Sequence, residues 1–139
     1  MQKNVFLSFI ILFALSLSVT PAVADNHNNT AGSLKVEKAV MCKAVDQRVP
    51  LGTGNVFAGD AGKIYCFTRI TGAARETVVT HKWFLNGELK SSVDLPVESS
   101  NWRTWSTKKI DPSDAGDGMV EVVSSEGVVL TTIIFFIQE

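Results

Sequence analysis

Apolar and polar residues alternate with a period of two along most of the chain after Ser33, and clusters of turn residues cut this pattern into short runs. Asn86-Gly87 is typical of a tight β-hairpin turn, and residues 46–62 and 111–118, rich in Gly, Pro and Asp, predict loops. The alternation predicts seven β-strands, over residues 34–45, 63–71, 77–85, 89–97, 102–110, 119–123 and 128–137.

Seven short strands at this spacing, with no convincing amphipathic helix between them, favour an all-β fold. We expect an antiparallel, seven-stranded, immunoglobulin-like β-sandwich as the first choice and a small β-barrel as the second. The cysteine pairing of immunoglobulin domains is not reproduced, because Cys42 and Cys66 fall on the first two predicted strands.

The N-terminus has the features of a secretory signal peptide. A positive charge at Lys3 precedes an apolar run of about 15 residues, Val5–Val19, and Ala22-Val23-Ala24 forms a small-x-small cleavage site. The run is shorter than the ~20 residues that a membrane-spanning helix needs. Residues 1–24 are therefore predicted to be removed on export, leaving a periplasmic or secreted protein with no membrane span.

The remaining chain is divided into a lead-in and one domain. Residues 25–33 are polar and small, which predicts a disordered segment, and residues 34–139 carry the strand pattern. Removing residues 1–24 takes away one of the 13 basic residues and none of the 14 acidic ones, so the net charge becomes −2. A nucleic-acid-binding protein needs a basic surface, so a nucleic-acid partner is not expected.

Export also bears on the two cysteines. An even count in an oxidising compartment favours a disulfide between Cys42 and Cys66, which the strand pattern places on apolar faces. No Cys/His set suits zinc or haem. Asp111, Asp114 and Asp117 recur in one loop, but their spacing matches no calcium loop and turn chemistry explains them. No metal and no cofactor is therefore predicted.

Candidate catalytic residues are few. His27 falls in the lead-in, which leaves His81 as the imidazole that Ser106 or Ser92 could use as a base, without any nucleophile elbow in the sequence. Two interpretations of His81 remain open. It packs with Trp83 as a core pair, or it lies at a rim where its charge changes between pH 5 and 8. We expect a protein that is not an enzyme.

The segment 102–109 is the main candidate for a contact surface. Alternation sends Trp102 and Trp105 to opposite faces, and Trp105 shares its face with Arg103 and Lys109. A flat ring beside cations can stack on a sugar or anchor a protein interface. The alternative is that Trp105 lies in the core and Arg103 extends along the domain surface. His81 and Trp83 are the second choice for this contact.

The last predicted strand is apolar on both faces, whereas a sandwich strand normally shows one polar face to water. Leu130, Ile134 and Phe136 share one of these faces in the alternation. Either another part of the chain covers this face or a partner does, and the strand could also lend its edge to a neighbour.

An ordered set of short motifs runs through the predicted domain. It resembles the bacterial domain-of-unknown-function family numbered 2914 over about residues 36–137, with Met119 where a Trp is expected. The resemblance implies a small envelope domain and brings no activity, ligand or functional residue. The motifs are Cys42, Asp46-Gln47-Arg48-Val49-Pro50, Phe57, Tyr65-Cys66-Phe67-Thr68, His81-Lys82-Trp83, Trp102-Arg103-Thr104-Trp105-Ser106, Gly118-Met119-Val120-Glu121-Val122, Gly127, Leu130 and Phe135.

Together these features predict a non-catalytic exported domain that binds a protein partner or another envelope component. A glycan- or peptidoglycan-binding module is the alternative, and a hydrolase is the least favoured function. The sequence does not fix the oligomeric state.

Overall fold

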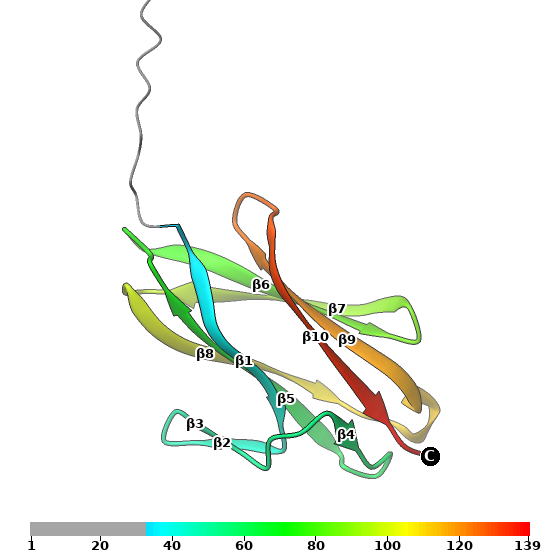
Figure 1. The fold of residues 1–139 in the computed structure, drawn as a ribbon. Helices are drawn as coiled ribbons and strands as arrows, with labels where there is room; N and C mark the ends of the chain where they lie inside the picture. The colour runs from blue at the N-terminus through cyan, green and yellow to red at the C-terminus, as the bar shows by residue number, and fades with distance from the viewer. Residues whose placement is uncertain (1–32) are drawn as a thin grey trace, which may run out of the picture.

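A computed structural model describes residues 33–139 (Figure 1). The predicted signal peptide, residues 1–24, and the lead-in up to residue 32 lie outside the described residues. The strands are β1 (Lys35–Cys42), β2 (Ala44–Asp46), β3 (Val49–Leu51), β4 (Val56–Phe57), β5 (Lys63–Thr71), β6 (Thr77–Leu85), β7 (Glu88–Val97), β8 (Asn101–Lys109), β9 (Gly116–Ser124) and β10 (Val129–Ile137). One 3₁₀ turn, η1 (Pro112–Asp114), is the sole helical element in this part of the chain.

The strands form three sheets, which confirms the all-β prediction. Their orders are β1-β5-β8, β4-β10-β9-β6-β7 and the small hairpin β2-β3. All pairings are antiparallel except that of β4 with β10. The two larger sheets pack face to face around one apolar core (Figure 1). Across the described residues they do not join into a closed barrel, so the second-choice architecture is wrong.

The structure confirms the seven predicted strand regions, but the predicted loop is wrong in part. Each of the seven predicted strand regions holds a strand, namely β1 and β5 to β10. The predicted loop 46–62 instead contains most of the β2–β3 hairpin and β4. Its hairpin turn is Gln47-Arg48, with φ of 45° and 61°, values that favour Gly or Asn. The hairpin was missed because its turn lacks these residues.

Aromatic rings at the centre of the core hold the two sheets together. The Phe135 ring packs edge-on against Trp83 at 6.1 Å and against Phe57 at 6.4 Å between centroids. Gly118 lies opposite Phe135 on the neighbouring strand, and a Cβ at Gly118 would collide with the Phe135 ring. The glycine thus leaves the space that Phe135 fills.

The two cysteines are free thiols, so the predicted disulfide is wrong. A bulge in β1 near Glu37 shifts its alternation by one residue. As a result Met41 lies opposite Cys66, while Cys42 lies opposite Tyr65 on the other face of the sheet. Both thiols are buried, and burial raises the pKa of each, that of Cys66 to about 12.

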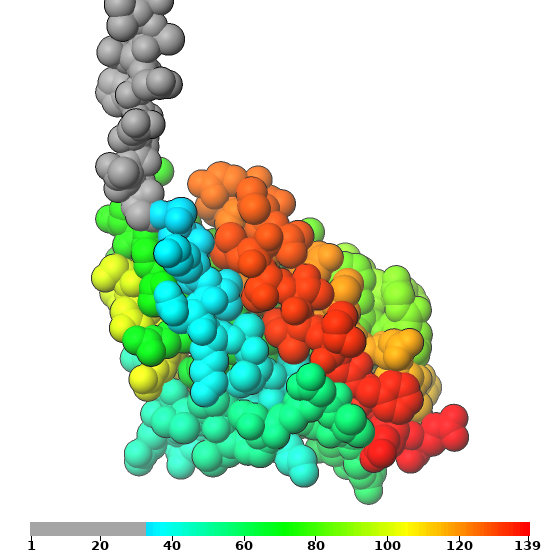
Figure 2. Space-filling model, viewed as in Figure 1, coloured from blue at the N-terminus to red at the C-terminus, as the bar shows by residue number. Residues whose placement is uncertain are grey.

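A second bulge changes the assignment of Leu130 on the last strand. The register of β10 shifts between Val129 and Thr131, so Leu130 does not share a face with Ile134 and Phe136. Leu130 is half-buried against the core, and β1 lies beside β10 at this side of the molecule (Figure 2). Ile134 and Phe136 remain exposed.

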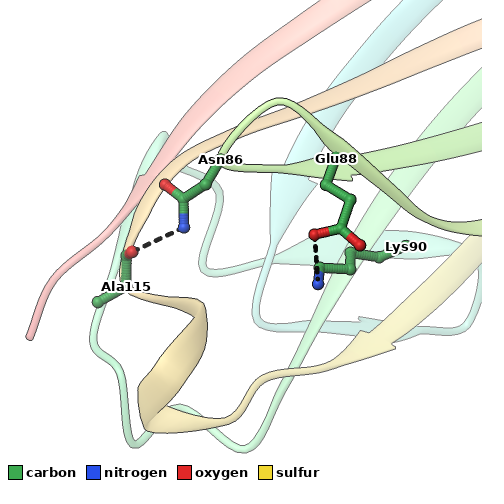
Figure 3. Close-up of polar contacts among 4 residues, drawn as sticks. All are labelled: Asn86, Glu88, Lys90 and Ala115. Atoms are coloured by element: carbon green, nitrogen blue, oxygen red, sulfur yellow. Dashed lines mark hydrogen bonds and ion pairs between the residues drawn. The ribbon is translucent and has the colours of Figure 1, made fainter.

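Asn86 ties two turns together at one end of the sandwich. Its side-chain Nδ2 donates to the Ala115 carbonyl at 3.0 Å (Figure 3), and its Oδ1 accepts from the Asp117 backbone N–H at 3.1 Å. Asn86 has φ of 50°, as the Asn-Gly hairpin signal predicts. The β6–β7 turn is therefore fixed to the start of β9.

Candidate ligand-binding groove

Strand β8 presents its two tryptophans to different surroundings. Trp105 lies on the outer face of the three-stranded sheet and stacks on Phe67, with centroids 6.3 Å apart and planes 14° apart. Trp102 lies on the inner face and packs against the margin of the core. Both side chains are half-buried. Neither tryptophan of this strand is therefore a core residue, which leaves part of each ring at the surface.

The β2–β3 hairpin brings Arg48 onto this strand. The Arg48 guanidinium carbon lies 4.8 Å from the centroid of the Trp102 ring, a distance typical of a cation–π contact. Arg48 Nη2 donates to the Arg103 carbonyl at 3.3 Å, and Arg103 Nη1 donates to the Arg48 carbonyl at 3.5 Å. Because β8 is an edge strand, the first of these bonds also satisfies a carbonyl on that edge.

The backbone of the hairpin turn is strained in a way that serves this contact. Gln47 and Arg48 both take left-handed φ values, which cost energy in residues that carry a Cβ. Strain of this kind is often found where a side chain must be held in a particular place. Here it places the Arg48 side chain over Trp102.

An open groove of about 470 Å³ follows from this arrangement. We call it the arginine–tryptophan groove, and it is lined by Arg48, Pro96, Glu98, Trp102, Arg103, Thr104 and Trp105. A second hollow of about 380 Å³ shares Arg48, Trp102 and Arg103. Ligand sites typically combine apolar walls with a few polar groups in a volume of this order.

The charge in the groove is unbalanced. Arg48 and Arg103 are both exposed, and the lining contains one acid, Glu98. The ion pairs found in residues 33–139 join Lys90 to Glu88 and Lys109 to Asp111, so neither arginine of the groove is neutralised by a carboxylate. The groove therefore offers two guanidinium groups without a carboxylate partner next to aromatic rings.

Lys109 does not belong to this groove. It is paired in register with Lys63 at the far end of β8, about 20 Å along the strand from Arg103, given ~3.3 Å per residue. Its Nζ lies 4.0 Å from an Asp111 carboxylate oxygen. Of the three residues predicted for the contact surface, Arg103 and Trp105 are brought together and Lys109 is not.

Two interpretations of His81 were left open by the sequence, a core pair with Trp83 or a position at a rim. The structure shows the core pair. Both side chains are fully buried, so they cannot contact a ligand at the surface. Trp83 Nε1 donates to Ser106 Oγ at 2.9 Å, and Ser106 Oγ lies 2.7 Å from His81 Nδ1. His81 Nε2 lies 3.3 Å from Thr68 Oγ1. The polar atoms of both rings are thus satisfied inside the core.

The direction of the hydrogen bonds to His81 follows from the single proton that each hydroxyl group can donate. Thr68 Oγ1 uses its proton on the Thr104 carbonyl at 3.1 Å, so it accepts from His81 Nε2–H. His81 Nδ1 then accepts from the Ser106 hydroxyl. This chain of bonds suits a neutral imidazole, and burial lowers the pKa of His81 from its usual 6.5 to about 4.

Ser106 and His81 lie within the hydrogen-bond distance expected of a nucleophile and its base, but both side chains are buried. Their side chains contact at 2.7 Å, while His81 is fully buried and Ser106 is 4% exposed. The second imidazole nitrogen meets a threonine hydroxyl rather than an orienting carboxylate. A substrate could not reach this pair without opening the core.

Two of the aspartates in the 111–117 loop, Asp111 and Asp114, have structural partners. Asp114 Oδ2 accepts from the Asp111 backbone N–H at 2.9 Å, which caps η1. Across residues 33–139 no group of three or more His, Cys, Asp or Glu side chains could hold a metal ion. Nor does this part of the chain contain a helix long and apolar enough to span a membrane.

Sequence reasoning missed Arg48, Pro96 and Glu98 as groove residues. Arg48 lies 55 positions before Arg103, and no periodic pattern connects the two. One signal was available, because residues 46–50 and 102–106 are both among the motifs that carry the family resemblance. The structure places these two motifs in contact.

Comparison with known proteins gives one finding about this domain. None of the curated proteins compared with the chain matches it. Residues 76–137, which contain β6 to β10, match the model of a family described as "Protein of unknown function (DUF2914)". The matched segment includes Trp102, Arg103 and Trp105, whereas Arg48 lies before it. This match confirms the predicted resemblance to that family over residues 76–137.

Proposed function

We propose that this chain is an exported, non-catalytic recognition domain of a bacterial cell envelope, and that it binds an acidic glycan at the arginine–tryptophan groove. The observation that carries this proposal is the pair of guanidinium groups without a carboxylate partner, Arg48 and Arg103, beside the Trp102 and Trp105 rings in an open groove. Aromatic faces stack on sugar rings, and arginines bind carboxylates through paired hydrogen bonds.

Peptidoglycan is the ligand that fits this chemistry in the proposed compartment. It combines sugar rings with carboxylate-bearing peptides, and the predicted signal peptide would deliver the domain to it. The groove holds about 470 Å³, which suits one or two sugar units with a short acidic branch. The periplasm or the cell exterior is the proposed location.

The strand order supports an immunoglobulin-like sandwich as the finer description of the fold. Among the seven longest strands, the first, second and fifth form one sheet as β1-β5-β8. The other four form the second sheet as β10-β9-β6-β7. Sandwiches of this class distribute their strands in a similar way and bind ligands with loops or exposed strands at their margins. The groove lies at such a margin, between β7 and β8.

A hydrolase is not the function we propose. The burial of His81 and Ser106 keeps this nucleophile–base pair away from any substrate, and a buried His81 cannot serve Ser92 at the surface either. The residues that remain accessible in the groove bind charge and stack on rings. They include no base positioned beside a nucleophile.

Co-sedimentation with isolated peptidoglycan tests the proposal. We expect the secreted chain to pellet with the polymer and Arg103→Ala to weaken retention at least tenfold at low ionic strength, and this difference should shrink as added salt screens the guanidinium charge. Lys109→Ala is the matched control, since it removes an exposed cation from the same strand away from the groove. Equal retention of wild type, Arg103→Ala and Lys109→Ala would overturn the proposal.

A further inference from the structure

An apolar stripe crosses the outer face of the five-stranded sheet. Leu89 lies opposite Phe84, Phe84 opposite Met119, and Met119 opposite Ile134, so the four side chains form one row over β7, β6, β9 and β10. Leu89 is 50% exposed and Ile134 is 59% exposed. Phe136 and Val56, also exposed and paired in register, extend the patch at the β10 side.

This stripe is unusual for the water-facing side of a sandwich sheet. Such a face is normally polar, and a continuous exposed apolar patch usually marks an interface. Here the apolar row runs across strands, from one side of the sheet to the other. A surface that packs on it must therefore be broad and nearly flat, as a second sheet is.

The neighbouring row carries two charges that do not pair with each other. Lys82 of β6 lies opposite Glu121 of β9, and both side chains are half-buried. Adjacent opposite charges normally form an ion pair across strands. The ion pairs found in residues 33–139 do not include this one. Lys82 and Glu121 thus lie next to each other beside the stripe without a salt bridge between them.

We propose that this face is an interface between two copies of the chain. A twofold axis parallel to the strands, midway between β6 and β9, places each copy's β6 over the other copy's β9. The same operation places β7 over β10. Lys82 then meets Glu121 of the partner subunit, and Glu121 meets the partner's Lys82. Each charge then gains an opposite charge across the interface.

The apolar row obeys the same symmetry. Under this axis Phe84 faces Met119 of the partner subunit, and Leu89 faces the partner's Ile134. One operation therefore covers the whole row with apolar contacts and pairs both charges, as an isologous interface requires. The Glu88–Lys90 ion pair at 3.1 Å (Figure 3) flanks Leu89 in the sequence at the end of the row.

Sedimentation equilibrium of the purified secreted chain tests the interface. We expect a dimer at micromolar concentration and a monomer for Ile134→Lys. Leu89→Lys provides a second apolar variant should Ile134→Lys fold poorly. Val49→Lys, at an exposed apolar residue of the β2–β3 hairpin, is the control and should leave the dimer intact.

A charge exchange distinguishes a second copy from any other partner. Lys82→Glu and Glu121→Lys should each weaken dimerisation at least tenfold, and the double variant should restore it, because the symmetric pairs are re-formed with reversed signs. A wild-type monomer at every concentration, or a double variant no better than the single ones, would overturn the proposal. Dissociation by Val49→Lys would overturn it as well.

Discussion

The imidazole Nδ1 of His81 lies 2.7 Å from Ser106 Oγ, and this bond links the two sheets through the centre of the core. His81 belongs to β6 of the larger sheet and Ser106 to β8 of the smaller one. Trp83 Nε1 donates to the same Oγ. One hydroxyl therefore satisfies two rings of the opposite sheet, which makes Ser106 the residue on which the polar core depends.

Ser106→Ala should lower the free energy of unfolding by about 2–4 kcal/mol, because it leaves two buried ring nitrogens without a partner. Chemical denaturation measures this loss. Thr107→Ala, the exposed neighbour on the same strand, is the matched control and should change stability by less than about 1 kcal/mol. Similar values for the two variants would show that the hydroxyl is not needed.

The lowered pKa of His81 predicts how stability depends on pH. With a folded pKa of about 4 and an ordinary value of 6.5, the unfolded chain binds more protons between these limits. The contribution of neutral His81 is therefore complete above pH 6.5 and is lost as the pH falls toward 4. Between pH 7.5 and 5 we expect a loss of about 2 kcal/mol.

His81→Gln isolates this effect from that of the carboxylates. The variant should show a shallower decline of the unfolding free energy between pH 7.5 and 5, whatever its stability at pH 7.5. Denaturant titrations at both pH values give the comparison. Parallel declines in wild type and variant would contradict this account. They would mean that His81 takes up a proton over this pH range to the same extent in the folded protein and in the unfolded chain.

Cys42 and Cys66 should behave as inert thiols. Because both are buried and their pKa values are raised, iodoacetamide should add no label to the folded protein and two labels after denaturation without a reductant. Mass spectrometry counts the labels. A reductant should leave the melting temperature unchanged. A protein that takes up labels only after reduction would contain the bridge that the structure lacks.

The strand pattern was predictable because period-two alternation depends on local sequence, but the bulges in β1 and β10 were not. The extra residues near Glu37 and Leu130 reverse the alternation within a strand. They move Cys42 to the face opposite Cys66 and remove Leu130 from the face of Ile134. A bulge depends on pairing with a neighbouring strand, so a single run of residues does not reveal it.

The groove was predictable only in part for a related reason. Alternation placed Arg103 and Trp105 on one face of β8, and the structure brings both to the groove. It also grouped Lys109 with them, although about 20 Å of strand separates Lys109 from Arg103. Arg48 belongs to a hairpin that is distant in the sequence. Its position therefore depends on tertiary contacts, which the alternation of apolar and polar residues does not reveal.

The glycine at position 118 leads to a prediction about packing. Gly118→Ala should lower the unfolding free energy by about 1–3 kcal/mol, because the added methyl group displaces the Phe135 ring from its place between Trp83 and Phe57. Gly54→Ala is the matched control, since nothing lies near a Cβ at Gly54. Thermal or denaturant unfolding of both variants decides the matter, and equal stabilities would contradict this account of the core.

The strained Gln47-Arg48 turn allows function to be separated from stability. Gln47→Asn suits the left-handed backbone and leaves Arg48 in place, so it should raise the unfolding free energy by roughly 0.5–1 kcal/mol without changing peptidoglycan retention. Arg48→Gly relieves the strain too, but it removes the guanidinium from Trp102. Retention should fall at least tenfold while stability changes by less than about 1 kcal/mol.

The two variants together show whether the strain serves binding. If Arg48→Gly unfolded the protein or cost several kcal/mol, Arg48 would be part of the fold rather than of the groove. If it were stable and still retained on peptidoglycan, the stack on Trp102 would have no part in binding. We expect Arg48→Gly to be a stable protein that no longer binds peptidoglycan. This result would show that the strained backbone at Arg48 contributes to binding and not to stability.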